Sequence, residues 1–363
     1  TLEQPYRHGT AAMNSAIYIT PHPWFLLAIC LGVVVIGGLI ARFATGRVLR
    51  QLQAQEIVDQ PNERSSHVQP TPRGGGWGIL AVVIPVWTLV LSMTGFGLST
   101  LWLMLGAVVL AAISWIDDLR TIAARHRLAV HIIAVLLGIL ALDGLGPIVP
   151  LPLPLWLDRV IIALAWLWFL NLYNFMDGID GLAGSETASI GLGVVVVITA
   201  SPILIGGWPA GAVLGAALTA GSLGFLMLNW HPAKVFMGDV GSIPLGFLIG
   251  WLLFALAAQG HLTAAIILPL YFCADASLTL LKRLKNGAKP WEAHREHFYQ
   301  QSVQGGRSHG RTTAIVIIGN LALILCALAS IHIGWLALIP AVIMTGIVLA
   351  ILGRSRPDPV GII

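Results

Sequence analysis

Four amide and carboxylate side chains recur at every third position of the stretch FLNLYNFMDGIDGLAG, residues 169–184: Asn171, Asn174, Asp177 and Asp180. They close an apolar run, where polar side chains are costly unless they are paired or functional. Gly178 and Gly181 permit a helix to unwind after Asp177 and restart, which would bring Asp180 back toward the same point. A helix end followed by a turn explains one Asp and one Gly, but it leaves the two amides unexplained. We therefore interpret the stretch as part of a polar site.

Three further carboxylates stand near the ends of other apolar segments. Asp117 and Asp118 follow the apolar residues of AISWIDDLR, at the end of one predicted span, and Asp239 lies between glycines in NWHPAKVFMGDVGS. The adjacent pair could simply stop a helix, and the second stretch could be an ordinary polar loop. Both are therefore ambiguous when each is taken alone.

The stretch NWHPAKVFMGDVGS also offers the residue types that a nucleotide site needs. Lys234 supplies positive charge, Phe236 supplies a ring that can stack on a base, and Asn229 supplies an amide at a helix end. Glycines on both sides of Asp239 permit the backbone to approach a phosphate or a metal ion closely. We predict that this stretch binds a nucleotide.

Two loops carry residues suited to binding phosphate. In HREHFYQ, His294 and His297 flank Arg295, and we interpret all three as lying near phosphate groups. Two histidines at this spacing are weak evidence for zinc, because no Cys or third His follows at ligand spacing.

The other loop, NERSSHVQPTPRGGGWG, has Ser66, His67 and Arg73 ahead of a glycine run. Such a run could wrap a phosphate. A flexible linker explains the same pattern, so the sequence leaves both interpretations open.

Asp275 is an ionisable residue inside an apolar segment, seven residues before Lys282. Ionisable groups within a membrane are functional candidates by default. A structural hydrogen bond to neighbouring helices explains Asp275 equally well, and the sequence does not decide between the two.

Five carboxylates are expected to meet at one rim of the protein: Asp117, Asp118, Asp177, Asp180 and Asp239. Carboxylates in contact repel one another by roughly a few kcal/mol per pair at an effective dielectric of about 20, so either some are protonated or a divalent cation gathers them. Carboxylates that also face phosphates favour Mg²⁺. We predict Mg²⁺ among these carboxylates, with Mn²⁺ as the alternative. Such a site at a membrane indicates phosphoryl transfer between a soluble nucleotide and a lipid.

The elements that must position these residues are membrane-spanning helices. Hydrophobic residues make up 57% of the 363-residue chain and charged residues 10%, with a mean hydropathy of +0.85, whereas soluble domains carry roughly 25% charged residues. A span needs about 20 apolar residues, and we predict an all-α polytopic membrane protein with about eleven spans. The predicted spans are residues 24–41, 77–95, 98–116, 128–143, 157–175, 181–200, 209–228, 241–258, 262–281, 312–330 and 332–352. We expect residues 1–12, which precede the first methionine, to be a cloning remnant and residues 13–363 to form a single membrane domain.

Positive charge assigns the two sides of the predicted bundle. With eleven spans, eighteen of the twenty Lys and Arg residues fall on the side of the C-terminus, against Arg7 and Arg159 on the other. Basic residues stay in the cytoplasm, so we predict an external N-terminus and a cytoplasmic C-terminus. Every loop rich in Asp, Asn, Gly or His falls on the same side as the basic residues, which predicts an active site at the cytoplasmic rim.

Several motifs together resemble one enzyme family. NLYNFMDGIDGLAG, WIDDLR, KVFMGDVGSIPLG and PTPRGGG, with a late loop that contains His, resemble the polyprenyl-phosphate N-acetylhexosamine-1-phosphate transferases, in order from about residue 59 to residue 311. This family includes phospho-N-acetylmuramoyl-pentapeptide transferase and the enzymes that start O-antigen, common-antigen and teichoic-acid chains. The resemblance implies a multi-pass enzyme of the bacterial cytoplasmic membrane. It would move a sugar 1-phosphate from a UDP-sugar to undecaprenyl phosphate, release UMP and use Mg²⁺.

The resemblance also implies roles for individual residues. The implied metal ligands are Asp239, as the principal one, with Asp177 and Asp180. The implied nucleotide pocket consists of Asn174, Asn229, Lys234 and Phe236, which would lie against the uracil. The predicted catalytic residues are Asp117, Asp118, Asp177, Asp180, His294 and His297. The predicted phosphate ligands are Arg73, Arg127, Ser66, His67 and Arg295. Arg127 stands where the family often has lysine, which keeps the charge but alters the geometry.

Two departures favour the O-antigen-initiating branch over the muramoyl-pentapeptide transferases. The latter carry lysine where this chain has Thr121, and adjacent histidines where this chain has HREH. We expect GlcNAc or a 6-deoxy relative such as FucNAc or QuiNAc as the sugar and no nucleic-acid partner, and we leave a homodimer open. A secondary transporter and a CDP-alcohol phosphotransferase are the rival classes. Polar residues at one rim, rather than at the midplane, disfavour the first, and carboxylates spread over three loops disfavour the second.

Overall fold

The computed structural model describes residues 22–59, 70–120, 122–201, 208–289 and 294–354. Within these residues every element is helical except one antiparallel pair of two-residue strands, β1 (Val58–Asp59) and β2 (Thr71–Pro72). The α-helices are α1 (Pro23–Ala54), α2 (Gly76–Met93), α3 (Gly97–Leu119), α4 (Ala124–Leu140), α5 (Leu155–Phe175), α6 (Leu182–Ala200), α7 (Pro209–Asn229), α8 (Asp239–Leu256), α9 (Leu262–Ile267), α10 (Leu270–Lys285), α11 (Phe298–Gln304), α12 (His309–Ile333) and α13 (Leu338–Gly353). A π-helical turn, η2 (Ala257–His261), joins α8 to α9, and a 3₁₀ turn, η3 (Gly334–Ala337), joins α12 to α13. The predicted helical fold is confirmed.

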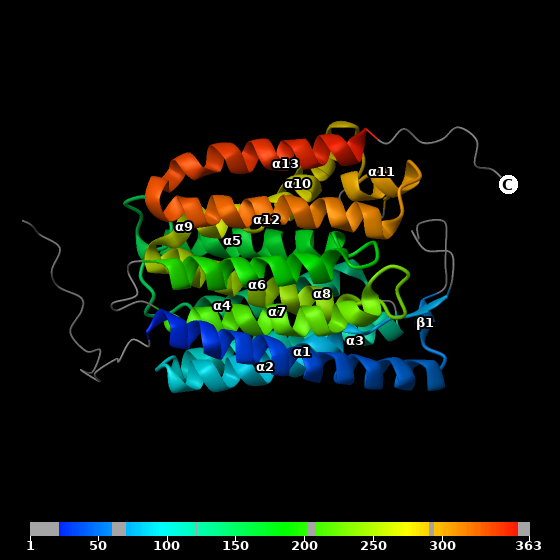
Figure 1. Cartoon of the computed structure of the whole chain (residues 1–363), viewed down its shortest axis with the longest axis horizontal. Coiled ribbons are helices and arrows are strands. Elements are labelled where there is room, and N and C mark those ends of the chain that lie inside the picture. Colours follow the sequence, from blue (N-terminus) through cyan, green and yellow to red (C-terminus); the bar gives the residue numbers. More distant parts are fainter. Residues whose placement is uncertain (1–21, 60–69, 121, 202–207, 290–293, 355–363) are drawn as a thin grey trace, which may run out of the picture.

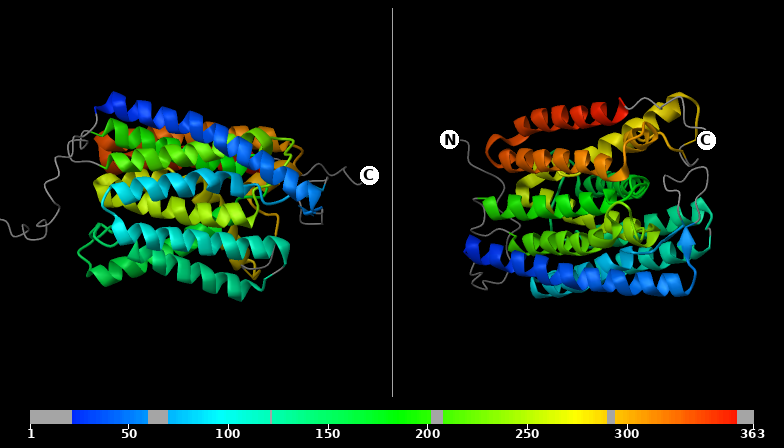
Figure 2. Two further views of the ribbon diagram at one scale, coloured as in Figure 1. Left: turned by 90° about the horizontal axis from the view of Figure 1, so that it is seen from below. Right: turned by 45° about the vertical axis from the view of Figure 1, so that its right-hand side comes forward.

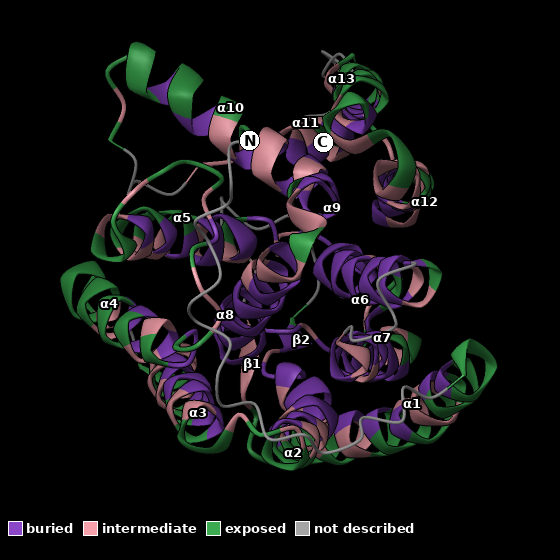
Figure 3. Cartoon of the chain, turned by 90° about the vertical axis from the view of Figure 1, so that its left-hand side faces the viewer, coloured by how far each residue is buried: buried purple, intermediate pink, exposed green. Residues whose placement is uncertain are grey.

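Most of these helices run side by side along the long axis of the molecule (Figures 1 and 2). The view along that axis places α8 among the others, with buried residues facing inward and exposed residues at the periphery (Figure 3). Helix α8 is buried along nearly its whole length, whereas α1 exposes large apolar side chains such as Trp24, Phe25 and Leu39. Apolar surface of this extent is rare on proteins in water, and it is what helices that face lipid require.

Eight helical segments among the described residues are long and apolar enough to cross a membrane, as expected for a multi-pass membrane protein. The predicted number of eleven spans is not established. Helices α4 and α10 have 17 and 16 residues, at or below the lower limit for a span. Helices α12 and α13 belong to one apolar segment of 45 residues that turns back at η3, so that they lie side by side (Figure 1). The membrane face to which each end of the bundle belongs stays a prediction, and residues 1–12 lie outside the described part of the chain.

Candidate active site

The polar motifs of the sequence meet at one end of the bundle, at the right in Figure 1. There α3, α5 and α7 end, and α2, α6, α8 and α12 begin. Ion pairs between residues more than a hundred positions apart join these ends, such as that of Arg73 with Asp239. Carboxylates that are distant in the sequence, such as Asp118 and Asp239, therefore lie together at one end of the bundle, and their role in catalysis stays a prediction.

The two glycine-rich motifs lie against each other through their backbones. The Phe236 N–H donates to the Pro72 carbonyl at 2.8 Å, and the Gly74 and Gly75 N–H groups donate to the Phe236 carbonyl at 3.1 and 2.8 Å. Gly76 is required by close approach, because a Cβ at this position would lie 2.2 Å from the Cα of Gly241. The N–H groups of Gly74 and Gly75 are thus engaged within the protein and are not the phosphate donors that the glycine run suggested. The run instead sets Arg73 beside the start of α8.

Two arginines link three of the carboxylates. Arg73 contacts Asp118 through Nε at 3.0 Å and Asp239 through Nη2 at 2.5 Å. Arg127 contacts Asp117 at 2.8 Å and the other oxygen of Asp239 at 3.6 Å. The two guanidinium groups therefore neutralise part of the carboxylate charge, which we had predicted that a metal ion would neutralise. The predicted contact of both arginines with phosphate stays a prediction.

Asp118 fixes the start of α8 from the end of α3. Its carboxylate accepts hydrogen bonds from the Asp239 N–H at 3.2 Å and the Val240 N–H at 3.1 Å, which carry the positive end of the helix dipole. The preceding residue, Gly238, has a φ of +76° and would place a Cβ 2.8 Å from an Asp118 oxygen. Asp118 therefore positions Asp239, a role that the sequence did not indicate. Asp117 in turn accepts the Ile122 N–H at 2.6 Å, which closes the end of α3.

Asp177 completes this group of carboxylates, and its side chain has no hydrogen bond or ion pair among the described residues, although its backbone N–H donates to the Asn174 carbonyl at 3.2 Å. Burial raises its pKa to about 7 against the attraction of Arg73, and the nearby Asp239 and Asp118 carboxylates add to the rise. The residues Asp117, Asp118, Asp177 and Asp239, here called the carboxylate cluster, carry four negative charges when ionised. Arg73 and Arg127 balance two of them. With all four ionised, two negative charges remain, which one divalent cation would balance.

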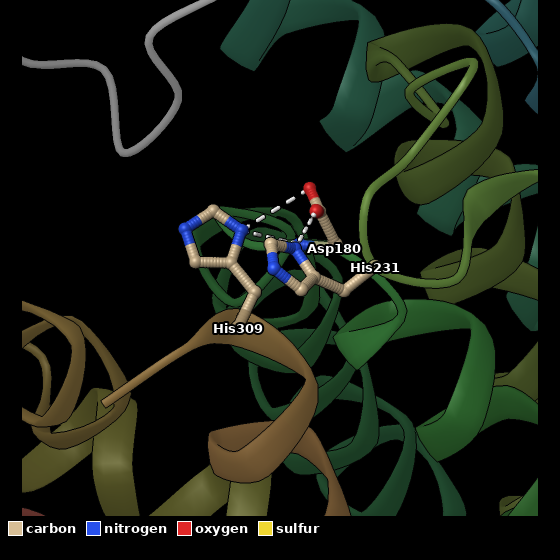
Figure 4. Close-up of side chains that lie close together, drawn as sticks. All are labelled: Asp180, His231 and His309. Carbon is tan, nitrogen blue, oxygen red and sulfur yellow. Dashed lines mark hydrogen bonds and ion pairs between the residues drawn. The ribbon is translucent and has the colours of Figure 1, made fainter.

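Asp180 lies between two histidines (Figure 4), and no hydrogen bond or ion pair joins its carboxylate to the carboxylate cluster among the described residues. One oxygen of its carboxylate is 2.6 Å from His231 Nδ1, and the other is 3.2 Å from His309 Nδ1. Burial alone would raise the pKa of Asp180, but the hydrogen bonds with His309 and His231 lower it below its ordinary value. The sequence analysis missed both histidines. Their positions in the sequence could have indicated them, because His231 closely follows one long apolar run and His309 precedes another.

The predicted nucleotide residues are placed near this end, but some of them have structural partners. Both polar atoms of the Asn229 amide bond the backbone, Oδ1 to the Gly181 N–H at 2.9 Å and Nδ2 to the Val235 carbonyl at 2.8 Å. Asn174 accepts the Ser242 hydroxyl at 2.6 Å and so ties α5 to α8. Lys234 is exposed and Phe236 half-buried. Their contact with a nucleotide stays a prediction.

Asp275 is wholly buried and accepts hydrogen bonds from three side chains and two backbone groups. The donors are the Tyr271 and Thr279 hydroxyls, His297 Nδ1, and the N–H groups of Phe298 and Tyr299. The last two belong to the first turn of α11, so Asp275 anchors α11 and the HREH loop to α10. This geometry supports the structural alternative for Asp275.

The HREH loop places its two histidine rings 4.9 Å apart. Burial, with His297 and Arg283 nearby, lowers the pKa of His294 to about 4, so this ring is neutral at neutral pH. The Arg295 carbonyl accepts the Gln304 side chain at 2.7 Å. The predicted phosphate ligands Ser66 and His67, and the departure at Thr121, fall outside the described residues.

A bundle of apolar helices with carboxylates, arginines and histidines gathered at one end has the character of a membrane enzyme that acts on a charged substrate. Comparison with known proteins makes the class specific. Residues 100–257 match glycosyl transferase family 4. Over 330 residues the chain is 30% identical to the decaprenyl-phosphate N-acetylglucosaminephosphotransferase of Mycolicibacterium smegmatis, which covers 77% of each protein. The chain therefore belongs to the family of polyprenyl-phosphate sugar-phosphate transferases, which share the glycosyl transferase family 4 domain.

Two further relatives show the range of the family. The probable undecaprenyl-phosphate N-acetylglucosaminyl 1-phosphate transferase of Bacillus subtilis is 29% identical over 273 residues, 72% of this chain and 74% of that protein. A phospho-N-acetylmuramoyl-pentapeptide-transferase of a Synechococcus species is 32% identical over 283 residues, 71% of this chain and 78% of that protein. The family resemblance that the motifs indicated is confirmed.

Proposed function

We propose that this protein transfers an N-acetylhexosamine 1-phosphate from a UDP-sugar to undecaprenyl phosphate in the bacterial cytoplasmic membrane and releases UMP. The carboxylate cluster carries this proposal, because it joins Asp118, Asp177 and Asp239 from three separate segments at the mouth of an apolar bundle. The names of the relatives, which describe GlcNAc phosphotransfer to decaprenyl or undecaprenyl phosphate, support the same reaction.

The cluster fits Mg²⁺. Its donors are all oxygens, which Mg²⁺ prefers, and its uncompensated charge matches a divalent ion. Asp239 and Asp177 would hold the ion, because both Asp118 oxygens are engaged with the start of α8. When bound, the ion would neutralise charge on the pyrophosphate and on the departing UMP. Asp180 is the least suited of the three predicted ligands, because its oxygens face histidines.

The side chains of the protein would contribute by positioning the two substrates. An oxygen of the lipid phosphate forms a bond to the β-phosphorus, and the bond from that phosphorus to the bridging oxygen breaks, so that UMP leaves with the electron pair. Arg73 and Arg127 are half-exposed and can turn from carboxylates to phosphate oxygens as the substrates enter. A phosphate monoester has its second pKa near ~6, so the acceptor needs little help from a general base. Asp117 and Asp118 therefore act through position and charge.

We assign the sugar to GlcNAc or a 6-deoxy N-acetylhexosamine such as FucNAc or QuiNAc, as the first membrane step of an O-antigen-type polysaccharide. This assignment is supported by Thr121 and by the HREH loop, which depart from the muramoyl-pentapeptide pattern.

The deciding experiment measures UMP release by the purified protein in detergent from a panel of UDP-N-acetylhexosamines. Each donor is tested with and without undecaprenyl phosphate and Mg²⁺. Release that needs both the lipid and the ion, with one preferred sugar, is expected. Absence of release from every donor, or release that is indifferent to the lipid, would overturn the proposal.

A further inference from the structure

Three chain segments that are distant in sequence bring a carboxylate and two imidazoles together beside the carboxylate cluster. Asp180 stands in the turn between α5 and α6, His231 follows α7, and His309 opens α12. One oxygen of Asp180 and one imidazole nitrogen of each histidine lie within 4.8 Å of one another. We propose that these three side chains form a second metal site, specific for a borderline transition ion of the Zn²⁺ class and separate from the magnesium site.

The donor set separates this site from the carboxylate cluster. Two imidazole nitrogens and one carboxylate oxygen are the protein ligands of open zinc sites, whereas Mg²⁺ takes oxygen. Ligand atoms around one zinc ion lie roughly 3 to 3.5 Å apart, given bonds of about 2.0–2.2 Å. His231 Nδ1 is 2.6 Å from one Asp180 oxygen and His309 Nδ1 is 3.2 Å from the other, so side-chain rotations would be needed to direct all three groups at one ion.

His309 offers its Nδ1 atom to the site. This nitrogen accepts the Asp180 backbone N–H at 3.3 Å and lies 3.2 Å from an Asp180 carboxylate oxygen. A nitrogen that accepts a hydrogen bond carries no proton, so it has the lone pair that a metal ligand needs. A metal ion between this nitrogen and the carboxylate oxygen would take that lone pair in place of the backbone N–H.

The carboxylate is also held as metal-binding carboxylates usually are, by hydrogen bonds from outside the site. The Ala233 N–H donates to Asp180 Oδ2 at 3.2 Å, and the Thr313 hydroxyl donates to the Asp180 carbonyl at 2.9 Å. Asp180 and His309 are nearly buried, whereas the His231 side chain is 37% exposed. Because His231 is exposed, an ion could enter from solvent at this residue, and water could supply a fourth ligand.

A metal ion here would join the α5–α6 turn, the loop after α7 and the start of α12. It would therefore fasten the C-terminal helix pair to the rim that carries Asp177, three residues before Asp180. The role that we assign to the ion is structural, so its binding does not depend on the transferase activity proposed above.

The test uses the full chain without a histidine tag, stripped of metal by a chelator and then titrated with Zn²⁺ alone. Bound zinc is counted after desalting, and the apparent Tm is measured by tryptophan fluorescence. We expect one zinc per chain and a Tm several degrees higher. In His231→Gln and His309→Gln, zinc affinity should fall at least tenfold and the rise in Tm should vanish.

Two matched controls separate this site from other causes. His332→Gln removes an exposed histidine at the other end of α12 and should bind zinc like the unchanged protein. Asp239→Asn alters the magnesium site and should also leave zinc binding unchanged.

A titration of the unchanged protein with Co²⁺ in place of Zn²⁺ tests the ligand set without any variant. The visible absorption of a four-coordinate Co²⁺ complex would report the N₂O ligand set even if a histidine variant fails to fold. Less than a fifth of an equivalent of zinc, or binding that both histidine variants retain, would overturn the proposal.

Discussion

The carboxylate of Asp118 holds the backbone of Asp239 in place, through hydrogen bonds to the first two N–H groups of α8, while Arg73 bridges the two side chains. Asp118 thus positions Asp239, the carboxylate that we propose binds the metal ion. The two carboxylates should therefore fail differently when they are replaced, although both lie in the same cluster.

Asp118→Asn should lower both stability and activity. The amide keeps one acceptor oxygen but turns an N–H group toward a backbone donor and loses the ion pair with Arg73. Loss of a helix cap costs about 0.5–2 kcal/mol, which should appear as a lower Tm of the detergent-solubilised protein. An unchanged Tm with strongly reduced activity would show that Asp118 acts on substrate instead.

Asp239→Asn should abolish most activity, by about 100-fold or more, and leave the protein folded. Its carboxylate faces the cluster, and no backbone group depends on that carboxylate among the described hydrogen bonds. Residual UMP release should no longer respond to added Mg²⁺, and gel filtration should match the unchanged protein. Turnover at the original rate would refute the metal assignment.

The affinity for Mg²⁺ should depend on pH through Asp177. Because its pKa is raised to about 7 in the folded protein, the ion must displace a proton below that pH, and affinity should rise about tenfold per pH unit before it levels off. The same shift makes the metal-free protein lose stability as pH rises from about 4 to 7, because the unfolded chain gives up this proton more easily. Mg²⁺ titrations from pH 5.5 to 8.5 check the first effect, and a flat profile would contradict it.

Asp275→Asn should destabilise the HREH loop more than it changes the chemistry. Several buried donors would lose their acceptor, at about 1–3 kcal/mol for each one left unsatisfied. We expect a Tm lowered by several degrees and faster proteolysis within α11, with activity partly recovered at low temperature. Loss of activity with unchanged Tm and proteolysis would favour a direct role for Asp275.

Glu186 and Asn320 form a buried pair between α6 and α12, with one bond of 2.6 Å from Asn320 Nδ2 to Glu186 Oε2. Glu186 Oε1 and Asn320 Oδ1 have no partner among the described residues. Glu186→Gln should be tolerated within about 1 kcal/mol, because its amide N–H can donate to Asn320 Oδ1. Glu186→Ala should cost about 1–3 kcal/mol by stranding the Asn320 amide. Equal Tm values for the two variants would contradict this pairing.

The sequence predicted the helices and the polar end of the bundle because both follow from local composition. Apolar length marks the spans, and amides or carboxylates within apolar runs, such as Asn174 and Asp177, mark the site. The count of spans was less secure. Helices α4 and α10 are short, and the turn that separates α12 from α13 contains only η3.

The partners of the polar residues could not be predicted, because they are separated by long stretches of chain. Arg73 is 166 residues from Asp239, and Asp118 is 121 residues from the N–H group that it accepts. Spacing gave no reason to take Asp180 out of the magnesium group or to connect it with His231 and His309. Nor could it show that Asn229 and Asp275 bond backbone groups.

By itself, then, the sequence determined that this is a helical membrane protein with carboxylates at one rim, since hydrophobic length and the cost of polar groups in lipid act locally along the chain. The tertiary structure alone decided which carboxylate faces an arginine, which caps a helix and which meets imidazoles. Those choices depend on helix ends that come together only when the bundle packs.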